Sequence, residues 1–271
     1  MTVSELTARL QLPAQTLSAI QNIPLPDHHA DLKDSFFRQT DLFQDFADAD
    51  PTGLTVLALY LHWALDTRAR YLELGIPEEY FWDSMKDIPI WCEDHLVKHG
   101  TPGFREWGWV AHSLRLNVIR IGRLQFAPGL LPQNVTITNQ EFPANTPVLD
   151  VHIPAGEALS PEAVIASINQ APGFFRKYMQ KQFPLFHCYS WLLSPDLKTL
   201  LPEDSRIMQF QKLFNVYGTD NEERQAEERV FGFLSDDPCE YPERTSLQKA
   251  VKQHLLNGKN VLMGSGIRLI G

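Results

Sequence analysis

The chain has 271 residues, of which 44% are hydrophobic and 21% charged, and its formal net charge is −9. A chain of this length and composition can bury a sizeable core, but its acidic balance argues against nucleic acid or an anionic membrane as a partner. The three cysteines are odd in number and far apart, which excludes a disulfide framework and a CxxC metal site. Because no apolar run reaches about 18 residues and residues 1–12 do not resemble a signal peptide, we expect a cytoplasmic protein.

The chain before residue 117 has helical periodicity. Apolar residues recur at helical spacing between Leu54 and Leu65. A second helix is expected from Pro77 toward Lys98, kinked or split by Pro89, and a third from Phe104 to Arg115. The sequence therefore predicts an all-helical N-terminal domain over residues 1–117.

After residue 117, strand-like and helical segments alternate. Residues 117–126 have a strand pattern that changes phase at Gly122, which we interpret as a β-bulge. Residues 261–270 are expected to form two short strands joined by a Gly-Ser-Gly turn. The remaining expected elements are strands at 135–137, 147–153 and 185–193, a helix at 161–169 interrupted by Pro172-Gly173, and helical or turn-like pieces at 197–201, 206–214, 222–231 and 246–256. The predicted fold class is α+β, with a mixed α/β domain over residues 118–271.

One predicted strand, at residues 147–153, carries side chains suited to chemistry. Asp150 and His152 alternate with apolar residues, so one face of the strand is apolar and the other holds a carboxylate and an imidazole. A loop with a glycine follows, and Ser160 is placed to cap the next helix, with Pro161 at its first position. A strand, a loop and a helix N-terminus in this order can hold a phosphate-bearing cofactor.

Four segments together resemble a bacterial family of the acyl-CoA N-acyltransferase superfamily. They are Glu106–Trp109, Arg120–Phe126, Leu149–Gly156 and Ser190–Leu193. Members of this family join a helical N-acyltransferase N-terminal domain to a GNAT-like C-terminal domain, and the resemblance covers nearly the whole chain with a boundary near residues 116–118. It implies that the strands at 148–153 and 185–193 and the intervening helix form a cleft for acyl-CoA or acetyl-CoA. The residues expected to contact this cosubstrate are Ile153, Pro154, Ala155, Gly156 and Ser160.

Acyl transfer to an amine by direct attack needs a base for the amine proton and an acid for the departing thiolate. Asp150 and His152 are the predicted candidates for the general base, and Tyr189 or Ser190 is the predicted general acid. His187 shares the face of Tyr189 on the strand expected to lie alongside. The expected function is transfer of an acyl group from acyl-CoA to a small-molecule or peptide amine in a ternary complex, without a metal.

The cofactor loop departs from the GNAT pattern, and this leaves an alternative open. GNAT enzymes carry Arg or Gln, two residues, Gly, one residue and then Gly or Ala at this loop, whereas residues 154–159 contain one glycine. Glu157 and Glu162 place two carboxylates beside the helix start, where they satisfy the helix dipole and repel a diphosphate. The alternative is a non-catalytic ligand-binding or interaction protein on a degenerate GNAT fold. In either case Cys188, within an apolar run, is interpreted as core, and the oligomeric state stays open.

Overall fold

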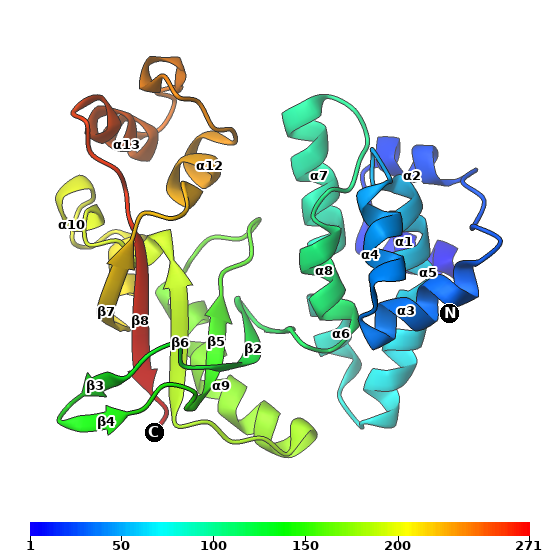
Figure 1. The fold of residues 1–271 in the computed structure, drawn as a ribbon, viewed down its shortest axis with the longest axis horizontal. Coiled ribbons are helices and arrows are strands. Elements are labelled where there is room, and N and C mark those ends of the chain that lie inside the picture. The colour runs from blue at the N-terminus through cyan, green and yellow to red at the C-terminus, as the bar shows by residue number, and fades with distance from the viewer. The chain divides into compact units, whose positions relative to one another are not determined.

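The computed structural model describes residues 1–271, and the chain forms two compact units (Figure 1). The first unit contains residues 1–121 and 154–156, and the second contains residues 122–153 and 157–271. Helices precede residue 117 and the sheet follows it, so the predicted α+β class is confirmed. No helix is both long enough and apolar enough to cross a membrane.

The first unit is helical because apolar residues recur at helical spacing around its longest helix, α5 (Leu54–Glu73). Helix α5 packs against four other helices of the unit, and its Tyr60 and Trp63 join Phe36 and Phe43 in a buried aromatic cluster. The remaining elements are α1 (Val3–Leu10), α2 (Ala14–Ile20), α3 (His29–Arg38), α4 (Asp41–Asp48), α6 (Glu78–Met85), α7 (Asp87–His99), α8 (Trp107–Leu114) and the short strand β1 (Ile119–Ile121).

The helix expected from Pro77 toward Lys98 is split into α6 and α7. The break falls at Lys86, ahead of Pro89, so this proline occupies the first turn of α7. N–H groups in a first turn have no intrahelical acceptor, and proline is tolerated there because it removes no helical hydrogen bond. Gly100 ends α7 in the left-handed conformation, with a φ of 69°.

The second unit is built on a mixed sheet whose strands lie in the order β2-β5-β6-β8-β7. These strands are β2 (Leu124–Leu130), β5 (Pro147–His152), β6 (Leu185–Ser190), β7 (Asn215–Asp220) and β8 (Met263–Leu269). Only β5 and β6 run parallel, and the crossover between them is the long helix α9 (Pro161–Met179), which lies behind the sheet in Figure 1. The hairpin of β3 (Val135–Ile137) and β4 (Gln140–Phe142) lies against the other face, where its apolar residues pack with Val148, Leu185 and Ile267.

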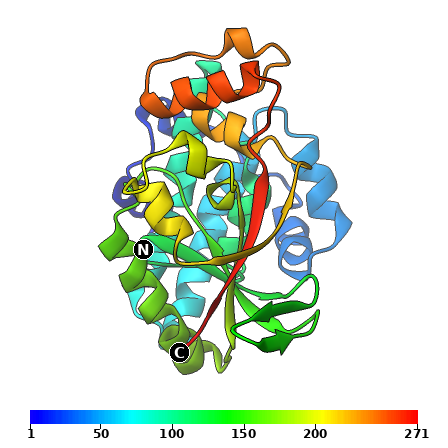
Figure 2. The same ribbon diagram turned by 90° about the vertical axis from the view of Figure 1, so that its left-hand side faces the viewer.

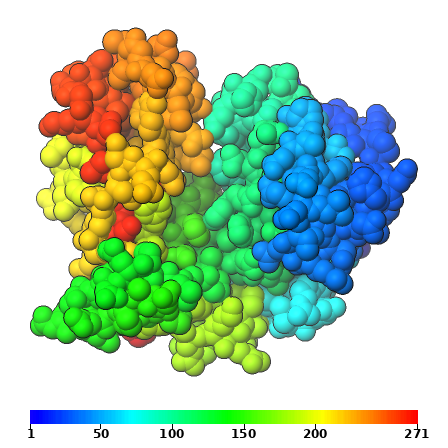
Figure 3. Space-filling model, viewed as in Figure 1, coloured from blue at the N-terminus to red at the C-terminus, as the bar shows by residue number.

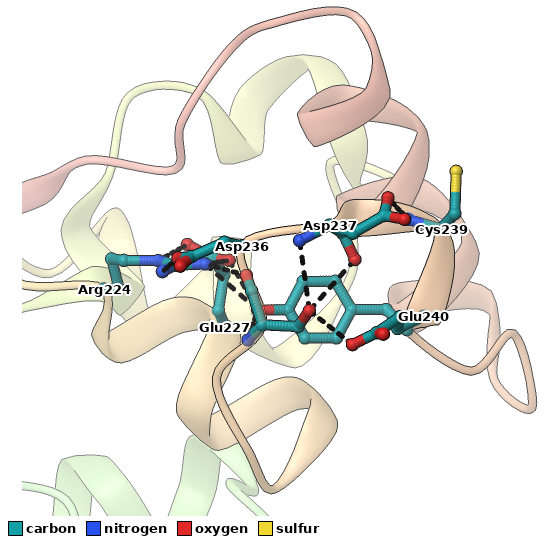
Figure 4. A network of polar contacts seen from close by, with 8 residues as sticks. Arg224, Glu227, Asp236, Asp237, Cys239 and Glu240 are labelled. Carbon is teal, nitrogen blue, oxygen red and sulfur yellow. Dashed lines mark hydrogen bonds and ion pairs between the residues drawn. The ribbon is translucent and has the colours of Figure 1, made fainter.

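Short helices complete the second unit, and a polar network holds the segment that follows α12 (Gln225–Phe231), as Figure 4 shows. Arg224 donates two hydrogen bonds to Glu227, at 2.9 and 2.7 Å, and one to Asp236 at 3.0 Å. Tyr241 donates to the buried Glu227 at 2.7 Å and stacks on Phe231. The network therefore ties residues 231–241 to α12. The elements are α10 (Leu197–Leu200), α11 (Arg206–Gln211), α12 (Gln225–Phe231), α13 (Ser246–Leu256) and two 3-10 turns at Trp191–Leu193 and Pro238–Glu240.

Two predictions at glycines were wrong. Gly122 is not a bulge within one strand; it begins a two-residue turn between β1 and β2, with a φ of 64°. Residues 261–270 do not form a hairpin, because β8 is one continuous strand. A Cβ atom at Gly264 would lie 2.5 Å from the carbonyl oxygen of Leu193, so this glycine permits close approach of backbone rather than a turn.

The interruption predicted at Pro172-Gly173 was also wrong, since α9 continues through both residues. Pro172 removes one helical hydrogen bond, but Ala171, Phe174 and Phe175 are buried around it. Burial of this apolar stripe outweighs the local cost of the proline. Strands β4 and β7 were not predicted at all.

Candidate active site

Asp150 and His187 form a hydrogen-bonded pair on one face of the sheet. They are register partners in the parallel ladder of β5 and β6, and Asp150 Oδ1 lies 2.7 Å from His187 Nδ1. A carboxylate only accepts hydrogen bonds, so Nδ1 carries the proton and the lone pair of a neutral imidazole lies on Nε2. Sequence analysis placed both residues on polar strand faces but paired Asp150 with His152.

Tyr217 of β7 occupies the other side of the His187 ring. Its hydroxyl donates to His187 Nε2 at 3.0 Å, although β8 lies between β7 and β6. Tyr217 reaches across because the ladder with β8 shifts register between Val216 and Gly218, which leaves Tyr217 as the extra residue of a bulge. Burial raises the pKa of Tyr217 and outweighs a hydrogen bond with Ser265 that lowers it, and the charge of Asp150 raises the pKa as well, so the hydroxyl stays protonated and remains a donor.

Gly129 of β2 leaves the space that the Asp150 carboxylate fills. A Cβ atom at Gly129 would lie 2.8 Å from Asp150 Cγ and closer still to Oδ2. The side chain of Asp150 is 28% exposed, whereas that of His187 is 10% exposed. The imidazole is therefore held by neighbours on two sides, and the carboxylate is held against β2 within reach of solvent.

The ladder between β5 and β6 ends at this pair. Its register runs from Val148 opposite Leu185 to Asp150 opposite His187, and neither strand pairs with the other beyond that point. Strand β5 continues to His152 alongside β2, and β6 continues alongside β8. The Asp150–His187 pair therefore lies at the last position of the β5–β6 ladder.

The other catalytic residues predicted from the sequence lie in different surroundings. His152 is half-buried on the same strand face as Asp150, beside β2. Tyr189 donates to Asp220 Oδ1 at 2.9 Å, and burial together with this carboxylate raises the pKa of its hydroxyl. Ser190 is buried, and its hydroxyl accepts from the N–H of Leu192 at 3.2 Å at the start of a 3-10 turn. Alternation along β6 places Ser190 on the opposite face from His187.

Cys188 lies on the sheet face opposite to His187, next to Phe186, and is buried. Burial raises the pKa of this thiol, and the charge of Asp150 raises it further. A neutral buried thiol is a poor nucleophile, which agrees with its interpretation as core. No cluster of three or more His, Cys, Asp or Glu side chains able to hold a metal ion occurs in the structure.

The N-terminus of α9 is capped as the sequence predicted. Ser160 Oγ accepts from the N–H of Ala163 at 3.2 Å and donates to Glu162 Oε2 at 3.0 Å, and Pro161 fills the first position. The exposed Glu162 carboxylate also takes its own backbone N–H, and these bonds lower its pKa. Donors at this helix start are therefore already satisfied by the chain itself.

A buried arginine that sequence analysis missed supports the loop before α9. Arg123 donates to the carbonyl oxygens of Glu157 and Ala158, at 2.8 and 3.1 Å. The predicted cosubstrate contacts are divided, because Ile153 and Ser160 belong to the second unit while Pro154–Gly156 belong to the first. The identity of Arg123 alone carried no signal, since its partners are main-chain atoms more than thirty residues away.

Two family models match the chain. The N-acyltransferase N-terminal domain matches residues 1–116, and the GNAT-like C-terminal domain matches residues 118–268. The chain belongs to the GNAT-like C-terminal domain family. The family resemblance drawn from the sequence is thereby confirmed. No curated protein matches the chain.

Solved structures of an acyltransferase are similar over almost the whole chain. The complex with decanoyl-CoA and teicoplanin is 25% identical, has a TM-score of 0.81, and the match covers 99% of this chain and 88% of the other. The complex with CoA and 10C-teicoplanin is 25% identical with a TM-score of 0.78 over the same shares of the two chains. The complex with decanoyl-CoA alone is 25% identical with a TM-score of 0.80, again over 99% and 88%.

Proposed function

We propose that this chain is an acyl-CoA-dependent N-acyltransferase that acylates an amine of a small molecule by direct attack in a ternary complex. The observation that carries the proposal is the His187 imidazole, held between Asp150 and Tyr217 where the β5–β6 ladder ends. Membership of the family and the similarity to an acyltransferase solved with decanoyl-CoA, CoA and teicoplanin support the same reaction.

In the proposed reaction the acceptor nitrogen attacks the thioester carbonyl, a C–N bond forms and the C–S bond breaks. Because the Tyr217 hydroxyl lies on His187 Nε2, the amine proton enters through Tyr217, which passes its own proton to Nε2. Asp150 then stabilises the imidazolium and keeps the ring oriented. The proton returns to the departing CoA thiolate, so the enzyme ends the cycle unchanged.

The cosubstrate is proposed to lie between β5 and β6 beyond the end of their ladder, where amides of its pantetheine arm can pair with strand residues. Ile153, Pro154, Ala155, Gly156 and Ser160 remain the proposed contacts of its diphosphate. Arg123 supports this assignment, because its two hydrogen bonds to the carbonyl oxygens of Glu157 and Ala158 hold the loop in one conformation. Decanoyl-CoA is the first acyl donor to test, since the similar structures contain it.

The decisive experiment compares His187→Ala with His152→Ala. Release of the CoA thiol and formation of the N-acyl product are followed with decanoyl-CoA or acetyl-CoA and a panel of amines. His187→Ala should lower turnover by about 100-fold or more while acyl-CoA affinity stays within a few-fold, as expected for loss of a general base. His152→Ala is expected to have a smaller effect. A larger loss of turnover in His152→Ala than in His187→Ala would identify His152, the residue predicted from the sequence, as the general base.

One observation favours the alternative of a non-catalytic binding or interaction protein. The Glu162 carboxylate already occupies the N-terminus of α9, where a diphosphate would otherwise be attracted. A ligand at 100 times its dissociation constant stabilises the folded state by about 2.7 kcal/mol, so acyl-CoA binding should raise the melting temperature. No thermal shift and no heat of binding with CoA in millimolar excess would favour the alternative.

A further inference from the structure

Strand β7 is the outer strand of the sheet, and its free edge is exposed. It pairs with β8 on one side and has no strand on the other. Figure 2 looks directly onto this gold strand, and in Figure 3 the same segment reaches the surface. Val216 and Thr219 are exposed along it. A free edge of this kind presents N–H and C=O groups that can pair with a further strand.

The two ends of β7 carry opposite charges. Exposed Lys198 of α10 and Lys212 lie at its beginning, where Lys212 also pairs with Glu203 at 2.8 Å. Exposed Glu222 and Glu223 follow its last residue. An antiparallel copy of the same strand would bring each basic beginning against an acidic end, so the edge is complementary to itself in charge.

We propose that two copies of this chain form a dimer in which their β7 strands pair antiparallel across a two-fold axis. Opposite residues in an antiparallel pair must point to the same face. Val216 and Thr219 satisfy this condition, because their partners in β8, Gly266 and Gly264, are two residues apart and therefore lie on one face of the sheet. Residues three apart in a regular strand would lie on opposite faces, but the extra residue of the bulge, Tyr217, brings Val216 and Thr219 onto the same face.

The resulting register places the axis at Gly218. Val216 of one copy then faces Thr219 of the other, and Asn215 faces Asp220. Lys212 lies three residues before Asn215 and Glu223 three residues after Asp220, so Lys212 of one copy comes near Glu223 of the other at each end of the paired strands. Gly218 has no side chain to obstruct the approach of its own copy at the axis.

A surface groove of about 610 Å³ lies beside the beginning of β7 and fits this arrangement. Lys198 and Lys212 border it together with the apolar side chains of Leu201, Phe214 and Val216. In the proposed register, the residues after the second copy's β7 pass along this groove, where Lys198 and Lys212 outnumber the single lining carboxylate of Glu203 and favour the charge of the second copy's Glu223. The dimer does not depend on acyl transfer, so measurements of the oligomeric state test this proposal independently of the proposed function.

The first test measures mass as a function of concentration by sedimentation. The wild-type chain should be dimeric, and Lys212→Glu and Glu223→Lys should each weaken the dimer by about 10-fold or more, because each places like charges in contact. The double variant Lys212→Glu/Glu223→Lys restores opposite charges and should restore the dimer. Lys33→Glu, which breaks a surface ion pair of α3 and α5 at 2.8 Å, is the matched control and should change nothing.

The second test fixes the register by crosslinking. In a Cys239→Ser background, which removes the one exposed cysteine, Val216→Cys/Thr219→Cys should give disulfide-linked dimers under mild oxidation. Facing residues lie about 5 Å apart, within disulfide range, whereas these two positions in one chain are about 10 Å apart. Each single cysteine variant should stay uncrosslinked. A monomer up to about 100 μM, or a dimer insensitive to the charge reversals and uncrosslinked by the cysteine pair, would overturn the proposal.

Discussion

Gly129→Ala is expected to impair catalysis although Gly129 itself takes no part in the reaction. The added Cβ would lie 2.8 Å from Asp150 Cγ, whereas carbon atoms in contact prefer about 3.5 Å or more. The carboxylate must therefore rotate or shift by about 1 Å, and because it lies between β2 and His187 of β6, this movement destroys the geometry of its 2.7 Å hydrogen bond to His187. Gly129 has no positive φ, so the backbone itself accepts alanine.

The magnitude follows from the bond that is lost. A hydrogen bond to a charged group contributes about 2 kcal/mol, and a misplacement of about 1 Å in a catalytic constellation costs on the order of 100-fold in rate. Turnover in the acyl-transfer assay should fall by about 30-fold to 100-fold, while acyl-CoA affinity stays within a few-fold. Gly173→Ala is the control, because a Cβ there meets nothing within 4 Å and alanine favours the helix.

The effect must act through the carboxylate. In an Asp150→Ala background, Gly129→Ala should therefore cause no further loss of turnover, because the residues form one unit and their effects are not additive. Full turnover in Gly129→Ala, or an equally large loss in the Asp150→Ala background, would refute the reasoning. Melting temperatures of all four variants separate a catalytic effect from unfolding.

Three further predictions concern groups outside the Asp150–His187 pair. Glu162→Gln removes a negative charge from the N-terminus of α9 and should tighten acyl-CoA binding several-fold by calorimetry, whereas Glu5→Gln, in the capping box of α1, should leave it unchanged. Cys188→Ala should keep most of the turnover and lower the melting temperature, since the thiol is buried and neutral; loss of turnover at an unchanged melting temperature would make it a nucleophile. For Glu227, burial raises the pKa, but hydrogen bonds from Arg224 and Tyr241 outweigh it and hold the pKa below the usual range of a glutamate. Its contribution is therefore fully present above the usual pKa of a glutamate and is lost as the pH falls through the lower folded-state pKa. Glu227→Gln should cost about 2 kcal/mol in urea unfolding at pH 7, and this cost should shrink as the pH is lowered into the acid range; a cost that does not change with pH would contradict this assignment.

Local interactions explain why parts of the fold could be predicted from the sequence. The cap of Ser160 on α9 and the apolar alternation of β5 involve residues within a few positions of one another. The helical character of residues 1–117 depends on a stripe that recurs along each helix, and burial of that stripe needs no particular partner. The family resemblance had the same origin, since its four segments are contiguous stretches of chain.

Glycine and proline were harder to interpret because their effects depend on neighbours. Gly122 starts a turn, but Gly264 sits in a continuous strand because the backbone of Leu193 approaches it. Pro172 is accommodated in α9 because residues on either side of it are buried. In each case the sequence shows a glycine or proline that allows more than one local conformation. Contacts with distant segments of the chain decide which conformation forms.

The candidate site was decided by sheet register. Asp150 and His152 were correctly placed on a polar strand face, but the partner of Asp150 is His187, because parallel pairing sets these two residues opposite each other. Tyr217 reaches the same imidazole across β8, from a strand that showed no clear pattern. Alternation along a strand is a property of adjacent residues, so the sequence by itself determined which side chains share a face. Register and strand order depend on packing between distant segments, so only the tertiary structure decided which of those side chains meet.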